Sequence, residues 1–301
     1  MEQDLKVSPT VSVIIPAYNY GRYVESSIES ALAQTYPISE IIVVDDGSTD
    51  ETECVVGGFG EQVRYIRLDH TGVSAARNRG VAESTGELLA FLDADDIWLP
   101  EKIAKQVARF SDPEIGLVYC GMQEFDSASG EPLDLQLNGA EGWVAHQHVL
   151  FEGKIIDAGG SAIMVSREAF DIVGGFDTCL RNGEDWEFCF RIAQRYKVGY
   201  VREALVDYRI HIANVTKDVA EMERSMLIAL GKIFETEDES LRRVRRRSYG
   251  NIHKVLAGSF LYSRDYLGFA RNVLKSLWYR PKFLRFYLRE LTRRRNGGVK
   301  R

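Results

Sequence analysis

The sequence predicts an α/β fold in which a mostly parallel sheet is flanked by helices and followed by a C-terminal helical region. Three observations support this prediction. Short, continuous apolar runs recur over roughly the first third of the chain, as in strands buried on both faces. Helical patterns with short connections alternate with these runs, and right-handed crossovers then give a parallel sheet. The last part of the chain contains only helical patterns.

The elements of the first half follow in order. The first strand is predicted to end at Pro16, because proline cannot donate to a sheet ladder. A helical pattern begins at Gly21. Ser48 and Glu51 have the spacing of a capping box, which predicts a helix from Ser48, and an alanine-rich helix follows Gly72. The strands are predicted at residues 11–15, 41–44, 63–68 and 88–92.

Three carboxylates follow the fourth predicted strand, at Asp93, Asp95 and Asp96. In an extended chain Asp93 and Asp95 lie on the same side. Like charges at the end of a buried strand need compensation, and a divalent cation, which prefers oxygen ligands, would supply it. The alternative is a solvated acidic turn that caps the helix predicted to begin near Pro100.

Polar loops follow three of the predicted strands, at residues 16–19, 45–48 and 93–96. Ligands of open parallel sheets bind at the carboxyl ends of the strands. The sequence has no Gly-x-Gly-x-x-Gly after the first strand and no P-loop, which weakens the case for a nicotinamide or P-loop nucleotide site. An acidic strand edge suggests that a metal ion, rather than backbone amides, neutralises any phosphates.

Four segments of the chain form a series: VSVIIPAYN at 11–19, VVDDGSTD at 43–50, GVSAARNRG at 72–80 and GELLAFLDADD at 86–96. Each motif alone is weak, whereas four in this order are specific. Together they closely resemble the nucleotide-sugar-dependent glycosyltransferases of family two, which have the GT-A fold. The resemblance covers about the first hundred residues, weakens from about 110 to 155, and returns between 160 and 215.

The resemblance implies roles for residues of the donor site. Tyr18 would stack on the nucleobase, the alternative being a packing aromatic. Asp46 would accept a hydrogen bond from a uracil-type ring, with Asp45 the weaker candidate, and helix capping is the alternative for both. Asp93 would contact the ribose or sugar. The implied donor-binding set is Pro16, Ala17, Tyr18, Asn19, Asp45, Asp46, Arg77, Asn78, Asp93, Ala94 and Asp95.

The resemblance also implies a metal ion and a general base. Asp95 would bind Mn²⁺ or Mg²⁺, and His211 would reach the metal or the diphosphate. Arg209 could serve the diphosphate instead. Asp185 would take the proton of the acceptor hydroxyl, although a carboxylate in the first turn of a helix is also explained by capping. Glu184 and Trp186 are candidates for the acceptor side of the site.

The middle of the chain is less informative. A helix is predicted at 99–110, strands at 115–121 and 161–165, a hairpin joining 122–125 to 133–137, and an edge strand at 198–201. Cys189, Ile192 and Ala193 have helical spacing and predict a buried stripe. His146 and His148 are two apart on a predicted helix, do not share a face, and are interpreted as ordinary polar residues.

Charge divides the chain near residue 218. Residues 219–301 carry 20 Lys and Arg against 8 Asp and Glu, a net of +12, whereas residues 1–218 carry 18 against 36, a net of −18. We therefore predict a GT-A domain at 1–218, with a nucleotide-sugar-binding half at 1–110 and an acceptor half at 111–218, and a basic helical region at 219–301. Its helices are predicted at 222–234, 241–262, 265–278 and 281–295.

The last predicted helix mixes aromatic and basic residues, which is typical of an interfacial amphipathic helix. Residues 242–301 are thus predicted to contact an anionic membrane, the alternative being a solvated basic face beside a packed apolar one. The four cysteines form no Cys-x-x-Cys pair, which fits a reducing compartment. With neither a secretory signal nor a membrane-spanning run, we expect a location in the cytoplasm or peripherally at the inner membrane face.

The resemblance, the acidic cluster and Asp185 together predict a metal-dependent, inverting glycosyltransferase. It would move a sugar from a nucleotide sugar, with a UDP-sugar as the expected donor, to a hydroxyl of a growing surface glycan or lipid-linked acceptor, and it would bind no nucleic acid. One alternative is a binding module that keeps the pocket without catalysis. Another is a sugar nucleotidyltransferase, which would carry a glycine-rich basic loop that residues 16–21 do not provide.

Overall fold

The computed structural model describes residues 8–153, 155–156, 159–211, 218–235 and 238–289. The chain divides into two compact units. The first comprises Met1–Ala145 and Lys154–Val215, and the second comprises His146–Gly153 and Thr216–Arg301. This division falls close to the predicted boundary at residue 218. The grouping of residues 146–153 with the C-terminal region was not predicted.

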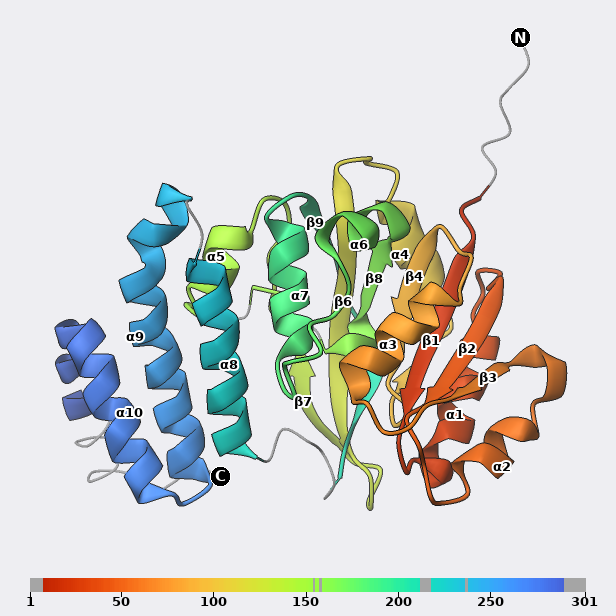
Figure 1. Ribbon diagram of the computed structural model, residues 1–301, viewed down its shortest axis with the longest axis horizontal. Helices are drawn as coiled ribbons and strands as arrows, with labels where there is room; N and C mark the ends of the chain where they lie inside the picture. Colours follow the sequence, from red (N-terminus) through yellow and green to blue (C-terminus); the bar gives the residue numbers. More distant parts are fainter. Residues whose placement is uncertain (1–7, 154, 157–158, 212–217, 236–237, 290–301) are drawn as a thin grey trace, which may run out of the picture. The chain divides into compact units, whose positions relative to one another are not determined.

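The first unit is built on a nine-stranded sheet with the order β3-β2-β1-β4-β8-β6-β9-β5, and β7 pairs with β6 (Figure 1). The strands are β1 Val11–Ala17, β2 Glu40–Asp45, β3 Arg64–Arg67, β4 Leu88–Phe91, β5 Ile97–Trp98, β6 Ile115–Asp126, β7 Pro132–Gln136, β8 Ile163–Ser166 and β9 Lys197–Ile210. The predicted hairpin is present as β6 and β7.

The two halves of the sheet differ in strand direction. β3, β2, β1 and β4 are parallel, as predicted, so their carboxyl ends share one edge. Beyond β4 the direction changes, because β8 is antiparallel to both β4 and β6. Only β6 with β9 is parallel in that half. The sheet as a whole is therefore mixed, and the parallel half carries the edge where the strand-end motifs meet.

Helices cover both faces of the sheet (Figure 1). One apolar core joins α1, α2 and α4 to one face, and α3 packs on the other. β1 is buried along its whole length, as expected for a strand covered on both faces. The helices of this unit are α1 Gly21–Leu32, α2 Thr52–Gly57, η1 Gly60–Gln62, α3 Val73–Ala82, α4 Lys102–Arg109, η2 Gly160–Ala162, α6 Arg167–Val173 and α7 Glu184–Ala193. α5, Ala145–Val149, lies at the point where the chain passes to the second unit.

Two predicted boundaries shift in the first half. β1 continues through Pro16 to Ala17 instead of ending at Pro16. This is tolerated because pairing with β4 ends at Ile14, so Pro16 has only β2 beside it. The helix predicted from Ser48 begins at Thr52, because the Ser48 amide donates to Asp45 and the Ser48 hydroxyl accepts from Asn19.

The predicted edge strand at 198–201 is longer and more central than expected. It is part of β9, which lies between β6 and β5. The sequence pattern understated its length because only its first half is an apolar run. The short β5, which was not predicted, supplies the neighbour that removes β9 from the edge.

The second unit contains three long helices: α8 Val219–Phe234, α9 Glu239–Tyr262 and α10 Tyr266–Tyr279. These match the predicted helices within three residues at each end. η4, Pro281–Phe283, and helical residues 284–289 follow, and the rest of the predicted 281–295 helix lies outside the described residues. Within the described part of the chain, no helix combines the length and low polarity needed to cross a bilayer.

Candidate active site at the carboxyl edge of the sheet

The loops after β1 and β2 are tied together by side chains from the predicted donor motifs. The Asn19 amide donates to Ser48 Oγ over 2.8 Å, and the Thr49 amide donates to Asn19 Oδ1 over 2.8 Å. Asn19 has a φ of 57°, a left-handed conformation that asparagine tolerates better than most residues. Asn19 therefore fixes the shape of this edge, and Pro16 and Ala17 are buried in β1 beneath it.

Asp45 and Asp46 have different environments. Asp45 is fully buried and accepts hydrogen bonds from the Ser48 amide at 2.8 Å and the Tyr65 hydroxyl at 2.6 Å. Asp46 holds the loop before α3, because its two carboxylate oxygens accept from the amides of Thr71 at 2.6 Å and Gly72 at 2.7 Å. Both carboxylates are thus used in positioning strand-end loops.

An aromatic pair lies at the rim of this edge. The Tyr18 side chain is 41% exposed, and its ring centroid lies 4.2 Å from that of His70. The Nδ1 atom of His70 lies 3.3 Å from the main-chain oxygen of Asp46. Tyr18 thus presents an accessible ring beside the loop that Asp46 holds, as a base-stacking role requires.

Arg77 joins the donor and acceptor halves of the predicted site. It is buried on α3, donates from Nη2 to Asp93 Oδ1 and from Nη1 to Glu184 Oε1, both over 2.7 Å, and lies over the Phe176 ring. The Nε atom of Arg77 has no hydrogen-bond partner among the described residues. Burial alone would lower the pKa of Arg77, but Asp93 and Glu184 raise it, so the guanidinium stays charged.

The remaining carboxylates of the cluster face other partners. Asp95 Oδ2 lies 2.9 Å from His211 Nε2. Burial and the neighbouring Asp93 raise the pKa of Asp95, while His211 opposes this shift. Asp96 is fully buried and accepts from the Ser161 hydroxyl and, over 3.0 Å, from the Arg209 amide. Asp96 therefore supports the turn, whereas Asp95 and His211 form a pair.

Asp185 opens α7 next to Glu184, and its environment raises its pKa to about 7, chiefly through burial and then through the neighbouring Glu184. Its Oδ1 accepts from the Trp186 amide at 2.7 Å. A carboxylate with a pKa close to neutral is suited to accept and release a proton at physiological pH. Glu184, by contrast, is held by Arg77.

Other predicted residues have supporting contacts. Asn78 exchanges two hydrogen bonds of 2.8 Å with the main chain of Phe176. A Cβ at Gly175 would lie 2.3 Å from Asn78 Oδ1, so glycine is required for this approach. Ala94 is buried in the acidic turn, and the Trp186 ring stacks on Phe190. Arg209 donates from Nε to the main-chain oxygen of Asp95 over 2.7 Å.

The chemistry of this edge fits a magnesium or manganese ion. Among the described residues, no three acidic, histidine or cysteine side chains form a complete metal cage. Mg²⁺ at nucleotide sites, however, is typically held by one or two carboxylates together with substrate phosphates. Asp95 follows β4 in the acidic turn and has His211 beside it, so it offers one such carboxylate at the edge where a diphosphate would lie.

A sequence model described as Glycosyl transferase family 2 matches residues 12–173, more than half of the chain. The chain belongs to glycosyltransferase family 2. The match contains the motifs at 43–50, 72–80 and 86–96 and all but the first residue of the motif at 11–19. The family identifies this protein as an enzyme of the glycosyltransferase class.

Named relatives of this family-2 chain are bacterial. An uncharacterized glycosyltransferase of Rickettsia prowazekii (strain Madrid E) is 32% identical over 231 residues, which cover 72% of this chain and 68% of the relative. EpsH of Bacillus subtilis (strain 168) is 29% identical over 223 residues, covering 70% and 63%. Some Rickettsia relatives are longer, and the matched region spans about 40% of the one from Rickettsia felis.

Solved structures share the fold of this family-2 chain. Residues 1–349 of S. aureus TarS, in complex with UDP-GlcNAc, align with a TM-score of 0.67 at 17% identity, covering 90% of this chain and 81% of that one. The mannosyltransferase PcManGT of Pyrobaculum calidifontis, in complex with GDP-Man and Mn²⁺, aligns with a TM-score of 0.64 at 18% identity, covering 95% and 81%. These likenesses confirm the predicted GT-A fold.

Sequence reasoning missed two residues of this edge. His70 follows β3, whose end shares the edge with those of β1, β2 and β4, so the strand-end rule could have indicated it. Ser161 accepts from the Asp93 amide at 3.0 Å and donates to Asp96, contacts that span more than 60 residues of sequence. No local sequence signal predicts Ser161.

Proposed function

We propose that this glycosyltransferase transfers a sugar from a nucleotide-sugar donor, a UDP-sugar, to a hydroxyl of a glycan or lipid-linked acceptor, in a metal-dependent reaction that inverts the anomeric configuration. The observation that best supports this proposal is the bridge in which Arg77 binds both Asp93 and Glu184. This bridge connects the end of β4, where a donor would bind, to the start of α7, where Asp185 lies.

The donor would lie along the carboxyl edge of the parallel strands. Tyr18 offers a ring for the nucleobase, with His70 beside it. Asp46 holds the loop that would border the base through the Thr71 and Gly72 amides, and its carboxylate would in addition accept a hydrogen bond from a uracil ring NH. Structures related by fold contain UDP-GlcNAc or GDP-Man, which supports a nucleotide sugar as the class of donor.

Asp95 would hold the metal ion, and His211 beside it would contact the metal or the diphosphate. Asp93 would contact the ribose or the sugar. When bound, Mn²⁺ or Mg²⁺ would neutralise the charge that builds on the leaving diphosphate. Arg77 would orient Asp93, since its other nitrogen is anchored on Glu184. The Mn²⁺ in the PcManGT complex supports this choice of ion.

Asp185 would act as the general base. It would take the proton of the acceptor hydroxyl as that oxygen bonds to the anomeric carbon, while the bond from this carbon to the nucleoside diphosphate breaks. One displacement with no covalent enzyme intermediate inverts the configuration. Asp185 fits this role better than Glu184, because the Glu184 carboxylate is already paired with Arg77.

Calorimetry of UDP binding with and without Mn²⁺ tests the donor site. We expect wild-type protein to bind UDP much more tightly with Mn²⁺, and Asp95→Ala to lose that difference while keeping its fold. Asp134→Ala is the matched control, because Asp134 is exposed on β7 away from the motifs. Unchanged, Mn²⁺-dependent affinity in Asp95→Ala would remove Asp95 from the metal site.

The products distinguish the proposed reaction from its alternatives. A glycosyltransferase supplied with UDP-sugars and candidate acceptors releases UDP, whereas a sugar nucleotidyltransferase releases pyrophosphate from a nucleoside triphosphate. A binding module releases neither while still binding the donor. Binding of UDP-sugars without any UDP release over a broad acceptor panel would favour the binding module.

A further inference from the structure

The second unit exposes the apolar side of α10. Leu267, Leu274 and Trp278 are 86%, 70% and 78% exposed. The fully buried residues of the same helix are small or polar, namely Gly268, Asn272 and Ser276, and Phe269, Val273 and Leu277 are half-buried. Helices of soluble proteins normally have the opposite arrangement, with apolar residues inside. The inverted pattern indicates that the outer side of α10 contacts something apolar.

The exposed residues form one stripe along the helix. Leu267, Leu274 and Trp278 are separated by seven and four residues, which places them on one side of an α-helix. The buried Gly268, Asn272 and Ser276 recur every four residues and face α9, and Asn272 Oδ1 lies 2.7 Å from Nδ1 of His253 on that helix. A Cβ at Gly268 would lie 2.4 Å from the Phe260 ring, so the two helices approach closely.

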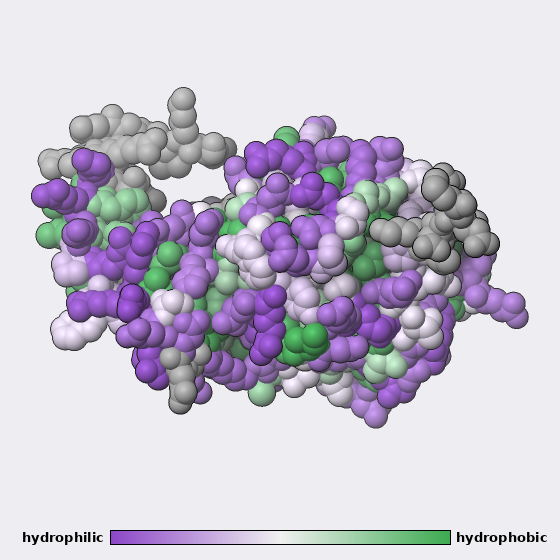
Figure 2. Space-filling model, turned by 90° about the horizontal axis from the view of Figure 1, so that it is seen from above, coloured by the Kyte–Doolittle hydropathy of each residue, from purple (hydrophilic) through white to green (hydrophobic). Residues whose placement is uncertain are grey.

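More exposed aromatic and apolar side chains flank this stripe at both ends. We define the α10 surface as the exposed apolar residues Tyr262, Tyr266, Leu267, Leu274, Trp278, Leu284, Phe286 and Leu288. In Figure 2 hydrophilic residues dominate the visible face of the molecule, and hydrophobic residues appear between them in small clusters. Contiguous exposed apolar surface of this kind marks contact sites.

The surroundings of the α10 surface are basic. Residues 262–289 contain seven Lys and Arg but one acidic residue, Asp265. The sequence of residues 290–301 adds five Lys and Arg and one Glu. Arg271 and Lys275 pair with the buried Glu223. Lys282 and Arg285 are both exposed. Aromatic and apolar residues among cations are typical of helices that bind anionic lipid surfaces.

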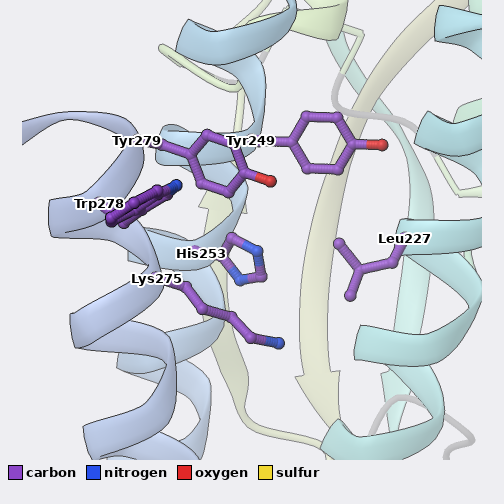
Figure 3. A pocket seen from close by; sticks show the side chains of 6 residues that line it. All are labelled: Leu227, Tyr249, His253, Lys275, Trp278 and Tyr279. Atoms are coloured by element: carbon purple, nitrogen blue, oxygen red, sulfur yellow. The ribbon is translucent and has the colours of Figure 1, made fainter.

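A pocket of about 360 Å³ adjoins this surface at Trp278. Figure 3 shows Tyr249 and Tyr279 along one side, with His253 and Lys275 below them and Leu227 opposite Trp278. All six lining residues come from α8, α9 and α10. The mixture of aromatic rings with one ammonium group suits a phospholipid headgroup and the start of its chains.

We propose that the α10 surface binds an anionic lipid bilayer, with Leu274 and Trp278 inserted at the headgroup boundary and the surrounding Lys and Arg residues near lipid phosphates. The observation that selects a bilayer is charge complementarity combined with a linear apolar stripe. A second copy of this chain is the competing occupant, since its residues 1–218 carry a net charge of −18. This inference does not depend on the proposed donor or base.

Vesicle sedimentation of the full chain tests the proposal. We expect binding to vesicles of phosphatidylcholine mixed with phosphatidylglycerol, and much weaker binding to phosphatidylcholine alone. Leu274→Ser combined with Trp278→Ser should lower partitioning about tenfold or more, because two inserted side chains are lost. The matched control is Leu133→Ser with Leu135→Ser. These two leucines are also exposed, at 51% and 50%, but lie on β7 in the first unit.

Charge reversal tests the electrostatic part. Lys282→Glu with Arg285→Glu should weaken binding to the mixed vesicles about tenfold or more and reduce its salt dependence. Arg195→Glu with Arg202→Glu, exposed in the first unit, should have a small effect. Circular dichroism confirms that each variant is folded, and UDP affinity measured in parallel should stay unchanged.

Three results would overturn the proposal: equal binding to both kinds of vesicle, undiminished binding of the Leu274→Ser, Trp278→Ser variant, or no binding at low salt. Gel filtration tests whether the α10 surface binds a second copy of the chain. If the wild type is a dimer that this double variant dissociates, the α10 surface binds a second copy instead of a bilayer.

Discussion

Single residues of the proposed site differ in what they are free to do. Asp45, Asp46 and Asp96 accept hydrogen bonds that fix loops, and Glu184 is paired with Arg77. Among the described residues Asp185 makes no such ion pair, and its pKa is raised to about 7. The adjacent Glu184 and Asp185 are therefore unequal, because one carboxylate neutralises a buried guanidinium and the other remains available for a proton.

The pH dependence of transfer should identify the base. A base must be deprotonated, so a pKa raised to about 7 means that the active fraction grows as the pH rises through 7. We expect kcat/KM to fall about tenfold per pH unit below that value. Asp185→Asn should lower kcat by ~10²–10⁴-fold and leave donor binding nearly unchanged. It should also remove the fall of kcat/KM below pH 7.

Glu184→Gln is the internal control. It should weaken the Arg77 bridge and lower activity modestly. The fall of kcat/KM below pH 7 should persist. If transfer survives Asp185→Asn and collapses in Glu184→Gln, Glu184 is the base. If Asp185→Asn leaves turnover near normal, capping explains this residue, because asparagine is a good helix cap.

At the level of elements, α4 carries an unusual buried cation. Lys102 Nζ is fully buried, donates to Gln106 Oε1 over 2.8 Å and lies 3.9 Å from the Trp98 ring centroid. Burial lowers the pKa of Lys102 to about 8. The amine therefore costs stability at neutral pH, since the unfolded chain keeps its proton more readily.

Lys102→Met should stabilise the protein at pH 7. Below pH 8 the wild type carries the full penalty of a buried charge, at most about 3 kcal/mol. Between pH 8 and 10.5 the folded state loses the proton first, so wild-type stability rises relative to the variant. The substitution also removes the donor to Gln106, which offsets part of the gain. We therefore expect the free energy of unfolding to rise by about 1–2 kcal/mol at pH 7, measured by denaturant titration.

The gain should shrink at pH 9.5. Lys105→Met is the control on the same helix, because Lys105 makes surface ion pairs with Glu101 and Glu203 and should change stability by less than about 1 kcal/mol at either pH. Destabilisation by Lys102→Met at pH 7 would show that the ammonium's contacts outweigh its burial.

The whole molecule combines an acidic unit that carries the site with a basic helical unit. Residues 1–218 and 219–301 have net charges of −18 and +12. The proposed donor site belongs to the first unit, because all of its residues lie in the parts of the chain that make up that unit. Ligand binding and lipid binding should therefore be separable in experiments on the full chain.

A nucleotide should stabilise the folded protein in proportion to its affinity. UDP at about 100 times its Kd adds about 2.7 kcal/mol, provided that it binds only the folded state. We expect UDP with Mn²⁺ to raise the melting temperature clearly, and UDP with EDTA to raise it little. Equal stabilisation under both conditions would contradict a metal-dependent site, and Leu274→Ser with Trp278→Ser should not change the shift.

The sequence by itself determined the parallel half of the sheet, its strand-end motifs, the three long C-terminal helices and the charge division. These features follow from local patterns, namely apolar runs, helical spacing, the acidic cluster that follows one apolar run, and the distribution of charged residues. The assignment of donor, metal and base roles came from resemblance and stays a prediction.

Only the tertiary structure decided which groups pair and which remain available. The bond from Arg77 to Glu184 spans 107 residues of sequence, and that from His211 to Asp95 spans 116. The mixed half of the sheet depends on β8 and β5 meeting strands far along the chain. The outward apolar side of α10 likewise depends on which side packs against α9. Periodicity is a local property, whereas partner choice and burial are set by how distant segments pack.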